Sequence, residues 1–176
     1  ISTPPQYNKE ILDNRKRIAA DSCVVDYAFY GAAGGQFPEE IEPLAQEGIV
    51  AYKSFLHQAP AGREKEFAGL TLANDAEIMT GMREIAKTGL MMASHAENND
   101  MIVHNIEEFR AKGWTKPIDH CKSRPAITEY STVSKLILMA KATGCKLELA
   151  HMSTPESCEL AKRAKSEGQS VFVETC

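Results

Sequence analysis

The chain has 176 residues, of which 43% are apolar and 25% charged, and its formal net charge is −4. These values are typical of a soluble globular protein with a sizeable core; they exclude a disordered chain and indicate no basic surface for nucleic acid or an anionic membrane. The apolar runs are shorter than the roughly 20 residues of a membrane span, and no signal peptide opens the chain, so we expect a cytoplasmic protein.

Helices and strands are predicted to alternate along the chain, after an initial helix over 6–20. Strands are expected over 23–30 and 171–174, and from about 49, 90 and 146 toward Leu56, His95 and His151. Helices are expected over 39–46, 75–87, 98–112, 128–142 and 154–168, several of them stopped by glycine. Residues 57–72 form a long loop, and 114–124 is expected to be irregular because of its flanking prolines.

This alternation predicts parallel strands joined by right-handed crossovers. A doubly wound sheet and a barrel both fit five strands. The barrel is favoured because candidate functional residues lie within or at the carboxyl ends of strands, where a barrel builds its active site. A complete (β/α)8 TIM barrel has about 250 residues, so residues 1–176 would be one domain holding about the middle five strands, with the N-terminal and C-terminal strands absent.

The two ends of the chain agree with that interpretation. The chain starts at Ile1 without a methionine and stops at Cys176, directly after a predicted strand. A domain seldom ends inside a strand, where unpaired backbone groups would be left at a sheet edge. We therefore expect a piece of a longer chain.

The cysteines show no pattern typical of disulfide bonds or of a zinc site. They are odd in number, form no Cys-x-x-Cys pair, and lie at Cys23, Cys121, Cys145, Cys158 and Cys176. A disulfide scaffold or a thiolate zinc site is not expected from such a pattern, and free thiols are the default.

A lysine and two histidines are the candidate functional residues. Lys53 lies in the middle of an apolar strand, while His95 and His151 each close a later one. A buried ammonium is costly unless it is paired, neutralised or bound. The ordinary interpretation is an edge-strand lysine whose ammonium reaches water, with the histidines as satisfied core or surface residues. The alternative is that all three side chains meet at one metal ion.

The chemistry of a lysine ligand requires modification of its amine. An ammonium has no lone pair to offer a cation, but reaction of the amine with carbon dioxide gives an anionic carbamate with two oxygens. Burial on an apolar strand favours this because it lowers the pKa of the amine. Histidine nitrogens suit zinc and similar divalent ions.

Several motifs together resemble those of the cyclic amidohydrolases of the hydantoinase, dihydropyrimidinase and allantoinase group. They are Lys53 in Gly-x-x-x-x-Lys-x-Phe, His95 in His-Ala-Glu-Asn, Arg124-Pro125 followed by Glu129, His151 in His-Met-Ser, and the closing Glu174-Thr175-Cys176. Each motif alone is modest, whereas the set, in order and spacing, is specific and covers nearly the whole chain.

The resemblance implies a metal-dependent barrel that opens cyclic amides and ureides through a metal-activated hydroxide. It implies a homotetramer with two divalent ions, zinc or related. From the charge of the chain we expect no nucleic-acid or membrane partner. Lys53 would be the N6-carboxylated bridging ligand, and His95 and His151 would bind the more exposed ion.

Two features depart from the family pattern. A first-strand His-x-His pair and a last-strand aspartate, which bind the other ion and supply the general base, have no counterpart, so this chain alone would be inactive. Dihydropyrimidinases also place an oxyanion-stabilising tyrosine five residues beyond the lysine. Here that residue is Gln58, with His57 beside it, and either could take over as hydrogen-bond donor.

Other interpretations stay open. The same fold could serve as a non-catalytic assembly protein, whereas a phosphate-binding doubly wound protein is disfavoured by the lack of a Gly-x-Gly-x-x-Gly or Gly-Lys-Ser/Thr loop. Arg124 and Glu129 are expected to form an ordinary salt-bridged helix start. Glu97 is a candidate to orient His95, and Ser153 is expected to serve the turn before the helix capped by Thr154.

Overall fold

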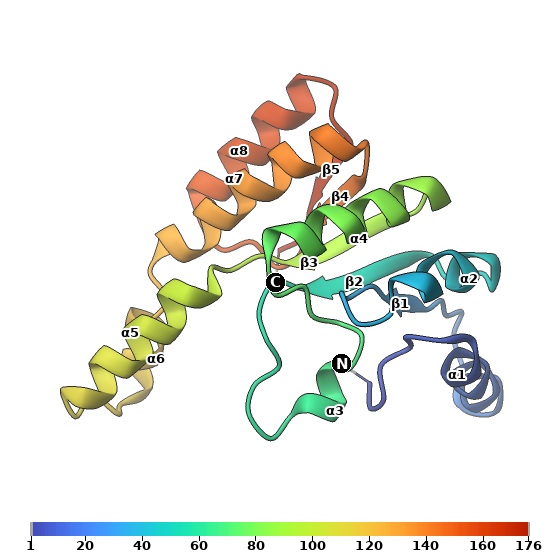
Figure 1. The fold of residues 1–176 in the computed structure, drawn as a ribbon, viewed down its shortest axis with the longest axis horizontal. Coiled ribbons are helices and arrows are strands. Elements are labelled where there is room, and N and C mark those ends of the chain that lie inside the picture. The colour runs from blue at the N-terminus through green and yellow to red at the C-terminus, as the bar shows by residue number, and fades with distance from the viewer. Residues whose placement is uncertain (1, 176) are drawn as a thin grey trace.

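The computed structural model describes residues 2–175 and shows an α/β fold (Figure 1). Its strands are β1 Tyr30–Ala32, β2 Ala51–Phe55, β3 Met91–His95, β4 Lys146–Leu149 and β5 Val171–Val173. Its helices are α1 Lys9–Ser22, the 3-10 turn η1 Pro38–Glu40, α2 Ile41–Gln46, α3 Glu64–Phe67, α4 Asp75–Thr88, α5 Asn99–Ala111, α6 Pro117–Lys122, α7 Ala126–Thr143 and α8 Pro155–Ser166.

The order of the strands distinguishes the two architectures that the sequence allows. All five strands are parallel, and each pairs with its neighbour in the chain, in the order β1-β2-β3-β4-β5. A doubly wound sheet reverses direction at a switch point, whereas a barrel adds each strand beside the last. The sheet is therefore an arc of a β/α barrel, as predicted.

The two faces of this sheet differ in character. The face covered by helices carries fully buried apolar side chains, including those of Tyr52, Met92 and Leu147. The opposite face, which we call the concave face, carries Lys53, Ala93 and Glu148 side by side in register. Burial of one face thus fixes which side chains point to the other.

The concave face is curved. The Tyr30 hydroxyl donates to Glu148 Oε2 at 3.5 Å, although β1 and β4 are separated by two strands. In a flat sheet these strands would lie roughly 14 Å apart, given a spacing of about 4.8 Å. The contact across β2 and β3 therefore reports the closing curvature of a barrel wall.

Two predicted segments differ from the structure. Only Tyr30 of the strand expected over 23–30 lies in β1, and Val24 in the preceding loop is 97% exposed. The β-branched residues of the segment 23–30 favour a strand only where they can be buried against neighbouring side chains. The segment 114–124 is not wholly irregular, because it contains α6, with Pro117 at its first position, where proline is compatible with a helix.

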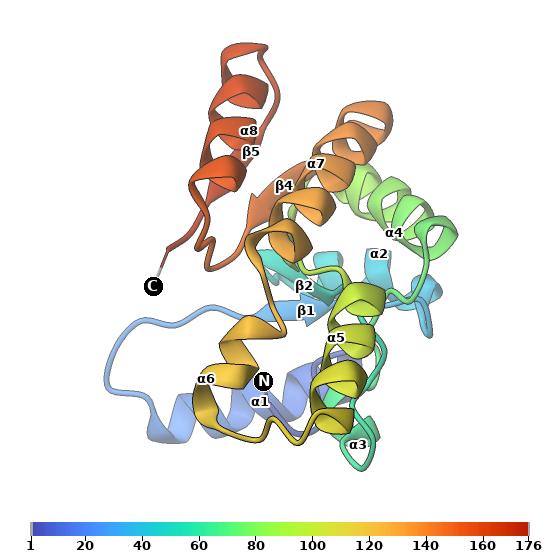
Figure 2. The ribbon, with the colours of Figure 1, turned by 90° about the vertical axis from the view of Figure 1, so that its left-hand side faces the viewer.

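The long loop after β2 also has structure of its own. It holds the short helix α3 and returns through Thr71 to bridge Phe55 at the end of β2. In Figures 1 and 2, α5 and α6 extend together beyond the carboxyl ends of the strands. The Asn105 amide nitrogen of α5 donates to the Ser123 carbonyl after α6 at 3.0 Å, which ties the two helices together.

Within residues 2–175 no helix is both long enough and apolar enough to cross a membrane.

Four cysteines are free thiols, as expected, at Cys23, Cys121, Cys145 and Cys158. Cys176 and Ile1 lie outside the described residues.

Candidate metal centre

Two histidines meet at the carboxyl edge of the sheet. His95 is the last residue of β3, and His151 lies two residues beyond the end of β4, so the prediction that it closes its strand is slightly wrong. His95 Nδ1 lies 3.0 Å from His151 Nε2. His151 has a φ of +44°, a left-handed conformation uncommon for a residue with a side chain. The main chain after β4 thus turns to aim this ring at His95.

Glu97 determines which nitrogen of His95 faces His151. His95 Nε2 lies 2.8 Å from Glu97 Oε2, and since a carboxylate accepts, this nitrogen carries the proton. The hydrogen bond from His95 holds the pKa of Glu97 below its ordinary value, although burial opposes the shift. A neutral His95 therefore presents an unprotonated Nδ1 toward His151.

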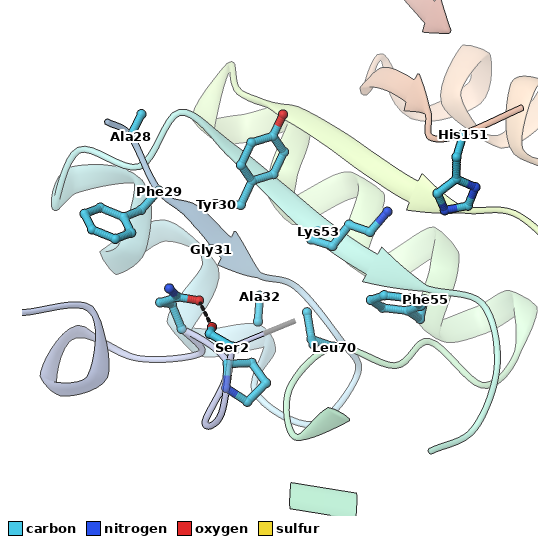
Figure 3. A pocket seen from close by; sticks show the side chains of 12 residues that line it. Ser2, Ala28, Phe29, Tyr30, Gly31, Ala32, Lys53, Phe55, Leu70 and His151 are labelled. Carbon is cyan, nitrogen blue, oxygen red and sulfur yellow. Dashed lines mark hydrogen bonds between the residues drawn. The ribbon is translucent and has the colours of Figure 1, made fainter. Parts of the chain in front are cut away.

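Lys53 lies in an adjoining cavity on the concave face. This cavity of about 420 Å³ is lined by Lys53, His151, Phe55 and Tyr30, among others, and Figure 3 shows the Lys53 amine directed toward His151. Strand β2 has a neighbour on both sides, so the interpretation of Lys53 as an edge-strand residue is wrong.

The charge state of the groups around this cavity is shifted by burial. Burial lowers the pKa of Lys53, against the attraction of Glu174 and Glu148. The pKa of His151 is also lowered, first by burial and then by the nearby charges of His95 and Lys53. Both shifts favour the uncharged forms, which have the lone pairs that a ligand or a nucleophilic amine needs.

His57 and Gln58 lie on the other side of His95. The His57 ring packs between Phe55, Phe67 and His95, with its centroid 5.6 Å from that of His95. Gln58 is exposed, and both residues line a second cavity of about 640 Å³ that also contacts His95. The structure thus brings His57 beside the histidine pair and leaves Gln58 at the mouth.

Glu129 has different partners from those expected. The ion pair of Arg124 is with Glu97, with 3.9 Å between Arg124 Nε and Glu97 Oε1, so the predicted Arg124–Glu129 salt bridge is wrong. Glu129 instead accepts hydrogen bonds from Ser153 and Thr154, in the turn where Ser153 was expected to serve. The sequence does not reveal this pairing because the residues lie 24 and 25 positions apart.

The donor set fits a divalent cation. Two imidazole nitrogens face each other, and the carboxylate on the far nitrogen of His95 is the usual outer partner of a metal-bound histidine. Within residues 2–175 no group of three or more His, Cys, Asp or Glu side chains is placed to hold a metal ion. A metal ion at the histidine pair would therefore need a further ligand from outside this set of side chains.

These features define a class of protein, a β/α barrel of which this chain forms an arc of five consecutive strands with its candidate site at their carboxyl ends. No family model matches the chain. Individual relatives do. The chain is 30% identical to an allantoinase of Deinococcus radiodurans over 175 residues, and 33% identical to an allantoinase of Bacillus licheniformis over 178 residues. These alignments cover 99% and 98% of this chain and 38% of each relative.

Solved structures agree. An L-hydantoinase (dihydropyrimidinase) from Arthrobacter aurescens superimposes with a TM-score of 0.90 at 28% identity, covering 98% of this chain and 37% of that one. The chain is thus homologous over its described length to the allantoinase, hydantoinase and dihydropyrimidinase group, which confirms the resemblance found in the sequence. It spans a little over a third of the length of these relatives.

Proposed function

We propose that the protein carrying this chain hydrolyses the ring of a cyclic amide or ureide of the hydantoin, allantoin or dihydropyrimidine type. The single observation that carries the proposal is the His95–His151 pair, with 3.0 Å between its facing nitrogens, beside a cavity that holds the Lys53 amine. The names of the homologues, allantoinase and hydantoinase, support this class of reaction.

In this proposal His95, His151 and an N6-carboxylated Lys53 are metal ligands in a site for two divalent ions, zinc being the first candidate. The ions, when bound, supply an activated hydroxide and polarise the scissile carbonyl. Glu97 keeps the proton on His95 Nε2 and so leaves Nδ1 free to bind. Burial lowers the pKa of the Lys53 amine from its ordinary value, which favours the unprotonated form that reacts with carbon dioxide.

His57 and Gln58 are the two candidates for the hydrogen-bond donor to the developing oxyanion, in place of the tyrosine of dihydropyrimidinases. Both lie on the loop that leaves β2, beside His95. We further propose a homotetrameric, cytoplasmic enzyme that acts on a small molecule and has no nucleic-acid or membrane partner.

The second candidate function is a non-catalytic assembly protein with the same fold. It is disfavoured because Lys53, His95 and His151 are all present and the two rings face each other. A protein that no longer bound metal would have no need of the proton held on His95 by Glu97.

Metal analysis of the complete protein that carries this chain tests the proposal. After mild purification we expect bound zinc, manganese or iron, and hydrolysis of hydantoin, allantoin or dihydrouracil. His95→Ala, His151→Ala and Lys53→Ala are each expected to lower the metal content by at least one ion and to abolish hydrolysis. His104→Ala, which alters an exposed histidine of α5, is the matched control and should retain both.

Two outcomes would contradict the proposal. A complete, folded protein without any of these metals would favour the assembly protein. Full metal content in His95→Ala or His151→Ala would remove the histidine pair from the site.

A further inference from the structure

The first turn of α7 contacts the loops that follow both histidines. The Thr128 carbonyl accepts from the Asn98 backbone N–H at 2.7 Å, three residues after His95. The next residue, Glu129, accepts from the segment two and three residues after His151. The first turn of α7 thus connects the segment after His95 with the segment after His151.

Glu129 makes an unusually complete set of contacts for a single carboxylate. Oε2 accepts from the Ser153 backbone N–H at 3.0 Å and hydroxyl at 2.7 Å, while Oε1 accepts from the Thr154 backbone N–H at 3.1 Å and hydroxyl at 2.6 Å. The residue is only 8% exposed. Burial alone would raise the pKa of Glu129, but the hydrogen bonds from Thr154 and Ser153 lower it on balance, so the group stays ionised.

The segment from His151 to Thr154 needs contacts with its surroundings to keep its backbone conformation. His151 has a left-handed φ of +44°, and such conformations persist only where the surroundings determine them. On the sheet side the Ala150 N–H donates to Ser94 and the Met152 N–H to Glu174, at 3.2 and 2.8 Å. On the helix side, the hydrogen bonds to Glu129 fix the same segment.

We propose that Glu129 is a positioning residue that sets the separation of His95 and His151 by anchoring the Ser153–Thr154 turn to the first turn of α7. Its hydrogen bonds are to Ser153 and Thr154 rather than to either ring, so it acts through the segment that follows His151. The proposal rests on the proposed function for its effect on metal binding, but its geometric part stands by itself.

The test uses Glu129→Gln in the complete protein, because glutamine keeps the size of the side chain and removes its charge and one of its two acceptor oxygens. Zn²⁺ affinity is measured by competition with a chelator. We expect a loss of about 10- to 100-fold, as is usual for groups that orient metal ligands. Glu129→Asp, which keeps the charge, should restore part of the loss. Asp119→Asn is the control, since Asp119 is a similarly buried carboxylate whose hydrogen bonds are to Lys116 and Lys122 at α6 and not to the turn after His151.

A crystal structure of metal-free Glu129→Gln provides a second readout. We expect a longer His95 Nδ1–His151 Nε2 distance than 3.0 Å and a changed φ at His151. Affinity within twofold of the unaltered protein, or an equal loss in Asp119→Asn, would overturn the proposal. If the unaltered protein binds no zinc, the proposed function fails, and the metal-free structure alone decides: an unmoved His151 overturns the positioning role and a displaced one supports it.

Discussion

At the scale of single residues, proton positions decide which groups can donate. His57 Nδ1 lies 2.6 Å from the Gln58 carbonyl, which can only accept, so this ring nitrogen carries the proton. Burial lowers the pKa of His57, which favours the neutral ring, and a neutral ring then offers only a lone pair at Nε2. The Gln58 amide is accordingly the better candidate to donate a hydrogen bond to an oxyanion.

Substitution of the two residues tests this difference. Gln58→Ala should lower kcat about 10²- to 10³-fold with little change in KM, because an oxyanion donor acts mainly in the transition state. His57→Asn should lower kcat less. The measurement is steady-state hydrolysis of the best substrate by complete proteins of equal metal content. A larger loss in His57→Asn would assign the donor to His57 instead.

At the scale of elements, the two strands that lead to the histidines are each preceded by a helix that ends at a glycine. Gly89 caps the end of α4 and Gly144 the end of α7, both with a φ of +72°. Glycine adopts this left-handed conformation without the steric cost of a Cβ atom. The chain can therefore reverse direction within two residues and enter β3 or β4.

Alanine substitutions at two glycines should change stability in opposite directions. Gly144→Ala is expected to lower the free energy of unfolding by roughly 1–2 kcal/mol, through backbone strain alone, since a Cβ there meets nothing within 4 Å. Gly81→Ala, inside α4, should raise it by roughly 0.5–1 kcal/mol, because its nearest contact would be an ordinary 3.5 Å to Leu72. Urea unfolding measures both. If both substitutions changed the free energy of unfolding by the same amount and in the same direction, the left-handed conformation of Gly144 and the helical one of Gly81 would be contradicted.

At the scale of the whole molecule, one face of the sheet packs against the helices and the other carries the side chains of the proposed site. One face packs Leu147, which is fully buried, against the helices. The concave face places Ala93 between Lys53 and Glu148 in register, and its small side chain leaves room for the lysine.

Substitutions on the two faces should therefore have different effects. Leu147→Ala is expected to cost about 2–5 kcal/mol of stability while the folded fraction keeps its metal content. Ala93→Leu adds volume beside Lys53 and should lower the metal content of the folded protein, at about 1–3 kcal/mol of stability. Metal per folded chain, measured beside urea unfolding, separates the two. Normal metal content in Ala93→Leu would show that the space beside Lys53 does not matter to the site.

The sequence by itself determined the features that depend on near neighbours. Alternating helices and strands, glycine at the ends of helices and the cap at Thr154 follow from local conformation and hydrogen bonding, and the structure has each of them, with Gly89 and Gly144 as helix caps. The positions of His95 and His151 at the carboxyl ends of successive units follow from the same pattern. The strand predicted from local preference at residues 23–29 is absent, because the β-branched residues there are not buried.

Only the tertiary structure decided which distant groups meet. The pairing of His95 Nδ1 with His151 Nε2 and the hydrogen bonds of Glu129 to the Ser153–Thr154 turn join residues between 24 and 56 positions apart. The sequential order of the strands likewise pairs residues that are distant in the sequence. Such contacts depend on register and curvature, and a shift of one residue in a strand would turn every side chain to the other face. Local propensity carries no information about that register, because it is set by packing the whole sheet against its helices.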